Sequence, residues 1–81
     1  MKIVKVKWLD VVTNCERDPL PHAMMAELGI WETVGFLIYE DEETIKLAHM
    51  IGDIPYAPTK TVSDYSVIPK GCIVERKEYG E

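Results

Sequence analysis

Two short apolar runs near the end of the chain are separated only by Pro69-Lys70-Gly71. A proline and a glycine within three residues force the backbone to change direction sharply without a wide loop. The runs on either side, Tyr65–Ile68 and Cys72–Lys77, have the length and composition of strands. This pattern predicts two strands that meet at a tight turn, and therefore a chain that folds from short β-strands.

Three earlier segments also read as strands. Residues 2–9 place Val4, Val6 and Trp8 on one face and lysines on the other, and residues 44–50 alternate in the same way. The segment between them is apolar on both faces, which is typical of a strand whose outer face is covered by another element or chain. The sequence thus predicts five strands, at about residues 2–9, 33–40, 44–50, 64–68 and 72–78.

The strands are expected to form a small five-stranded barrel, because closure removes the exposed edges of a sheet. Residues 10–32 are predicted to be one long loop that contains a short helix at His22–Leu28, after Pro21. The predicted fold is therefore mainly β, with a single domain over residues 1–81. A chain of this length buries only about 60% of its unfolded surface. It is therefore expected to gain stability from contacts with a partner or with copies of itself.

The turn in the segment Ile68–Ile73 is similar to the one-turn 3₁₀ link before the last strand of SH3-like and Sm-like barrels. The segments Val6–Asp10, Val34–Leu37 and Ile45–Ala48 resemble those of small phage and prophage proteins of unassigned function. This resemblance implies a fold rather than a reaction, and a place in the cytoplasm of a host cell. An Sm-like protein would form rings and bind RNA, but Pro69-Lys70-Gly71 stands where the Sm RNA site carries Arg-Gly.

The charge balance weighs against nucleic acid. The chain has 9 basic and 14 acidic residues, a net charge of −5, whereas phosphate neutralisation supplies much of the affinity of nucleic-acid binders. A local patch would still allow a single strand to bind, with lysines on its phosphates and aromatic rings stacked on its bases. The candidate contacts for this alternative are Lys5, Lys7, Lys46, Lys70, Trp31 and Tyr56.

No motif points to a reaction, a metal or a cofactor. Cys15, His22, His49 and Cys72 are the right residue types for zinc but lie too far apart in the sequence to form close ligand pairs. The acidic segment 40–43 lacks the glycine of a calcium loop, and there is no phosphate-binding loop or nucleophile elbow. We therefore expect no enzyme activity, no cofactor and two reduced cysteines in a cytoplasm. The chain also lacks a signal peptide and any apolar run of about 20 residues, so no membrane association is expected.

The most informative surface residues are the apolar ones expected on the outer faces of the second and third strands. They are Leu37, Tyr39, Ala48 and Met50, and they form a candidate oligomer interface. Either the helix around Ala23–Ala26 covers them or another chain does, and the sequence does not separate these two cases. The function expected is a non-enzymatic interaction or assembly module that works as a homo-oligomer or with another protein. The alternative is an Sm-like protein that binds single-stranded RNA or DNA.

Overall fold

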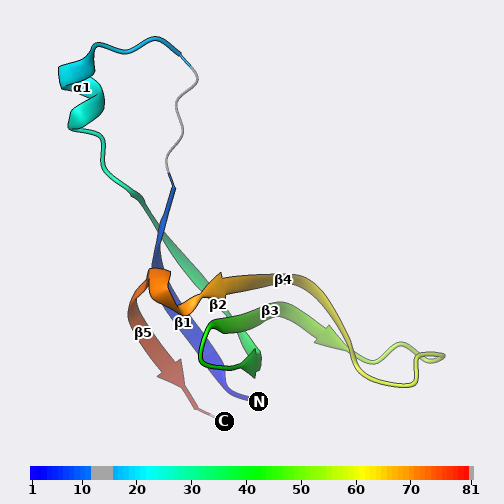
Figure 1. Cartoon of the computed structure of the whole chain (residues 1–81). Coiled ribbons are helices and arrows are strands. Elements are labelled where there is room, and N and C mark those ends of the chain that lie inside the picture. Colours follow the sequence, from blue (N-terminus) through cyan, green and yellow to red (C-terminus); the bar gives the residue numbers. More distant parts are fainter. Residues whose placement is uncertain (12–15, 81) are drawn as a thin grey trace.

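The computed structural model describes residues 1–11 and 16–80, and it is mainly β (Figure 1). Its strands form a single antiparallel sheet in the order β4-β3-β2-β1-β5. A short helix lies between the first two strands and a 3₁₀ turn before the last. The bounds are β1 (Ile3–Asp10), α1 (Leu20–Met24), β2 (Gly29–Glu40), β3 (Thr44–Gly52), β4 (Thr61–Pro69), η1 (Lys70–Cys72) and β5 (Ile73–Tyr79).

The prediction of a mainly β chain with five strands is confirmed. The predicted barrel is seen only as an open sheet, since β4 and β5 are its two edges and do not pair with each other in the described part of the chain. Two strands begin earlier than expected. β2 pairs with β1 as far as Gly29, opposite Asp10, and β4 pairs with β3 as far as Thr61, opposite Gly52. Pairing with a neighbour thus extends these strands beyond their own apolar alternation.

The core is small and lies on one face of the sheet. Val4 and Val6 from β1 and Ile45 and Leu47 from β3 have no exposed surface, and Ile68 from β4 is almost as buried. The inward faces predicted for β1 and β3 are therefore confirmed. Three partly buried side chains pack against this cluster: Trp8, Leu37 and Ile73.

β2 faces the core with different residues from those expected. Leu37 lies directly opposite Leu47 and packs on the core, so its predicted outward position is wrong. The pairing then skips one residue, because Tyr39 lies opposite Lys46. The bulge at Ile38 reverses the inward and outward alternation, and it leaves Leu37 and Tyr39 on opposite faces of the sheet.

Gly35 marks the closest approach of two strands. It lies opposite Val4, on the core side of β2, and is itself buried. A Cβ atom at this position would lie 2.8 Å from the carbonyl oxygen of Ala48 and 3.1 Å from the Cβ of Leu47. Only a residue without a side chain allows β3 to bend this closely over β2.

Two arms extend from the core in different directions (Figure 1). Pairing between β2 and β3 ends at Phe36 and Ala48, so beyond these residues β2 keeps only β1 as a neighbour and β3 keeps only β4. The first arm comprises residues 9–11 and 16–32 and carries α1, and the second arm comprises residues 50–63. The molecule is consequently elongated, with extents of 56 × 26 × 19 Å and a radius of gyration of 17.0 Å.

Candidate functional site

The four residues of the predicted interface do not form one patch. Leu37 packs on the core, and Ala48 has no exposed surface because it lies between Phe36 and Tyr65 in the cross-strand register. Tyr39 and Met50 are exposed, as expected, but they belong to separate parts of the outer face. The ammonium group of Lys46 lies over the ring of Tyr39, 4.7 Å from its centre.

The outer face instead carries a row of apolar side chains that crosses the whole sheet. Its members lie directly opposite one another on neighbouring strands, and the residues at its two ends are more than 40% exposed. From β5 to β4 the row is Tyr79, Ile3, Phe36, Ala48 and Tyr65. The row was not predicted, because it depends on the register of four strand pairs, and alternation within one strand carries no such information.

The arms expose further large apolar side chains. On the first arm, Trp31 is 57% exposed, and α1 leaves Met24 and Met25 exposed because it has no buried residue. The helix therefore does not act as a cover for the outer face, which was one of the two cases left open. On the second arm, Tyr56 is 98% exposed, and residues 50–54 and 61–63 of the same arm line an open hollow of about 210 Å³.

The predicted nucleic-acid contacts are scattered. Lys5 and Lys7 share the outer face of β1, whereas Lys70 lies in η1 and is held by Glu40 at 2.7 Å. Lys46 is a β3 residue at the other end of the sheet face, above Tyr39. The two aromatic candidates, Trp31 and Tyr56, belong to different arms. The structure thus brings together only Lys5 and Lys7.

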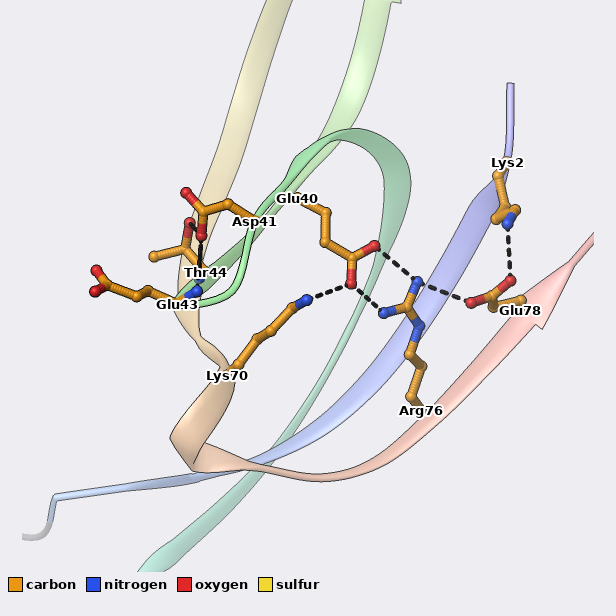
Figure 2. A network of polar contacts seen from close by, with 8 residues as sticks. All are labelled: Lys2, Glu40, Asp41, Glu43, Thr44, Lys70, Arg76 and Glu78. Atoms are coloured by element: carbon orange, nitrogen blue, oxygen red, sulfur yellow. Dashed lines mark hydrogen bonds and ion pairs between the residues drawn. The ribbon is translucent and has the colours of Figure 1, made fainter.

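A network of ion pairs joins elements that are far apart in the sequence (Figure 2). Glu40, at the end of β2, accepts hydrogen bonds from the Arg76 guanidinium at 2.6 and 3.1 Å and pairs with Lys70. Arg76 also contacts Glu78 at 2.8 Å, and Glu78 contacts Lys2 at 2.9 Å. The network therefore ties β2, η1, β5 and the start of the chain together beside the core.

The network changes the acidity of its central carboxyl. Hydrogen bonds from Arg76 and then Lys70 stabilise the charged form of Glu40 and lower its pKa from 4.5 to about 2. Between these two pH values the folded chain binds fewer protons than the unfolded chain, so the folded state gains stability as the pH rises. The contribution is fully present above pH 4.5 and is lost as the pH falls towards 2.

We expect Glu40→Gln to lower the free energy of unfolding at neutral pH by about 1 kcal/mol, since screening by solvent reduces the value that the full pKa shift would imply. The variant should also lose part of the decline in stability between pH 4.5 and pH 2. Urea denaturation at several pH values measures both effects. Glu42→Gln is the matched control, because Glu42 is exposed and has no ion-pair partner among the described residues. Equal pH profiles for the two variants would contradict the role of Glu40.

Residues 1–11 and 16–80 contain no group of three or more His, Cys, Asp or Glu side chains placed to hold a metal ion. Cys72 is a free, partly buried thiol, and His22 pairs with Asp18 at 2.6 Å on the surface of the first arm. Cys15 lies outside the described residues. Of the helices described, none is long and apolar enough to cross a membrane.

Comparisons of the chain with protein-family models, curated proteins and solved structures find no match. The geometry of the sheet, the two arms and the charged groups is therefore the basis for a functional proposal. Of these features, the arms and the outer face carry exposed large apolar side chains, which suit contact with another molecule.

Proposed function

We propose that the protein is a non-enzymatic assembly module that works as a homo-oligomer. The observation that carries the proposal is the size of its surface. The chain exposes 6611 Å², whereas a compact monomer of 9.3 kDa exposes about 5000 Å². The excess of about 1600 Å² is roughly twice the 800 Å² that each partner buries in a standard protein interface.

The shape leads to the same proposal. A compact chain of 81 residues has a radius of gyration of about 12 Å, against 17.0 Å here. The additional surface comes from the two arms, which carry exposed side chains such as Trp31, Ile54 and Tyr56. Isolated two-stranded ribbons are only marginally stable in water. Contact with a second copy would bury these side chains and support the arms.

We assign the sheet to the SH3-like or Sm-like type as part of this proposal. Its support is the strand order β4-β3-β2-β1-β5, together with a 3₁₀ turn between the two edge strands. The network around Glu40, which joins β2 to η1 and β5, is the kind of contact that curls a sheet towards closure. The resemblance to phage proteins, a location in the host cytoplasm and the absence of enzyme activity stay predictions.

Binding of single-stranded nucleic acid is the weaker alternative. Of its six candidate residues only Lys5 and Lys7 lie close together, and two of the lysines are already in ion pairs, Lys7 with Glu75 and Lys70 with Glu40. The net charge of −5 also repels a polyanion.

The oligomeric state tests the proposal. We expect light scattering at micromolar concentration to give a mass of at least twice the 9.3 kDa of one chain. Ile54→Glu should shift this mass downwards, because an interface would then hold a desolvated charge without a partner. Thr59→Glu, which adds the same charge at another exposed position of the second arm, should leave the mass unchanged. A monomer at all concentrations up to about 100 µM, the weak end of specific association, would contradict the proposal.

A further inference from the structure

The outer face of β1 and β5 contains an open hollow of about 310 Å³. It is lined by Lys5, Lys7, Glu75, Arg76 and Lys77. Lys7 is compensated, since its ammonium group lies 3.4 Å from Glu75 and 3.9 Å from Glu32. Arg76 is compensated by Glu40 and Glu78, so the excess positive charge of the hollow comes from Lys5 and Lys77.

Lys5 and Lys77 lie directly opposite each other on the paired strands. Like charges in this position destabilise a sheet, and neither lysine has an acidic partner among the residues that the structure describes. Lys77 instead lies over the ring of Tyr79, 5.3 Å from its centre. The pair is suited to an anionic group that enters the hollow and relieves the repulsion.

The turn between β2 and β3 offers such a group. The carboxylate of Asp41 is already hydrogen-bonded within the turn. Its Oδ1 atom accepts hydrogen bonds from the backbone N–H groups of Thr44 and Glu43, both at 2.8 Å. These bonds lower the pKa of Asp41 and fix the shape of the turn. Glu42 and Glu43 are the residues of the turn that are free to bind elsewhere, because their exposed carboxylates pair with no cation in the described part of the chain. The turn thus presents two negative charges on a rigid support, which limits the entropy lost on binding.

We propose that the Glu42–Glu43 turn of one copy docks in the Lys5–Lys77 hollow of the next copy. This inference rests on the proposed homo-oligomer and names the contact that sets its geometry. The two carboxylates equal the two ammonium groups in number and carry the opposite charge. Within one chain the turn makes no ion pair with the hollow among the described residues, so the partner is a second molecule.

The contact joins two different surfaces of the same chain. Such a head-to-tail contact generates a ring if the rotation between neighbours closes, and a filament if it does not. The apolar surface of the arms supplies affinity in this arrangement, and the charged contact sets the orientation of neighbouring copies.

Reversal of the charges tests the inference. One variant combines Lys5→Glu with Lys77→Glu, and the other combines Glu42→Lys with Glu43→Lys. We expect each variant alone to associate at least about tenfold more weakly than the wild type, a change readily resolved as a shift in Kd. An equimolar mixture of the two should associate again, because the reversed hollow then meets the reversed turn. Sedimentation velocity measures association, and circular dichroism shows that each variant is folded.

Arg17→Glu with Lys60→Glu is the matched control for the first variant. It changes the net charge by the same amount at exposed positions of the two arms, outside the hollow, so any loss of association that it causes should not be restored when it is mixed with the Glu42→Lys, Glu43→Lys variant. Association of the wild type should also weaken when the salt concentration rises from about 50 mM to about 0.5 M, because exposed charges are then screened.

The outcomes separate the two proposals. A wild type that is monomeric contradicts the homo-oligomer and this contact together. A wild type that assembles, but with no effect of either charge reversal and no recovery in the mixture, contradicts only this contact. Submicromolar binding of labelled poly-dT that is lost in the Lys5→Glu, Lys77→Glu variant would also overturn it, because the hollow would then hold a nucleic acid.

Discussion

Gly35→Ala is expected to lower the free energy of unfolding by about 3 kcal/mol, near the upper end of what an extra methyl group costs in a packed site. The added Cβ would lie 2.8 Å from the carbonyl oxygen of Ala48. This neighbour is backbone, so relief requires β3 to move away from β2 rather than a side chain to rotate. A total stability of roughly 4–12 kcal/mol is usual for a chain of this length, and the loss is therefore a large part of it. Urea denaturation with a constant m-value would measure the change.

Gly52→Ala is the control for this substitution. Gly52 also lies in a strand, at the end of β3, but no atom lies within 4 Å of the position of its Cβ. Here the alanine reduces the freedom of the unfolded chain and should be neutral or slightly stabilising. If both variants unfold at the same urea concentration, the close approach at Gly35 is contradicted.

Leu37→Glu is expected to unfold the protein rather than to act at a surface contact. Leu37 packs on the core directly opposite the fully buried Leu47, so the substitution places a charge without a partner against apolar side chains. The cost is several kcal/mol, comparable with the whole stability of the domain. Far-UV circular dichroism and a thermal melt would show the loss of the folded state.

Met50→Glu separates this result from an effect at an interface. Met50 is 59% exposed on the outer face, so the variant should keep the spectrum and melting behaviour of the wild type. If Leu37→Glu stays folded and only its mass in solution falls, then Leu37 faces outward and the register of β2 is wrong. The two substitutions introduce the same charge on neighbouring strands, so net charge does not explain a difference between them.

Regular alternation was a reliable guide where the strands are regular. Val4 and Val6 in β1 and Ile45 and Leu47 in β3 are buried as predicted, because a half-buried strand repeats every two residues. β2 departs from this rule at Ile38, where one extra residue changes the face of everything after it. Nothing in the apolar run around this position marks the bulge, since the residues on both faces are apolar.

The candidate site residues also divide into those that local alternation predicts and those that depend on long-range contacts. The common face of Lys5 and Lys7 follows from the alternation of β1 and is present in the structure. The position of Lys77 opposite Lys5 depends on the register between the first and last strands, which includes an irregularity after Lys7. Likewise, the sequence marks 40–43 only as an acidic segment, whereas in the structure Glu40 lies beside Arg76 through a contact between distant parts of the chain. Contacts of this kind arise from the packing of elements and leave no local pattern.

The place of β1 in the sheet has a consequence for how the chain reaches its folded state. β1 lies between β2 and β5 (Figure 1). Its residue Val4 is opposite Glu78, which is 74 positions later in the sequence. Contacts between residues so distant in sequence raise the contact order and slow folding, because a long loop must close before the contact is made. During synthesis the edge of β1 that pairs with β5 stays unpaired until β5 has left the ribosome. Throughout that time the nascent chain exposes an unpaired strand next to its most apolar residues, and it is then at greatest risk of aggregation.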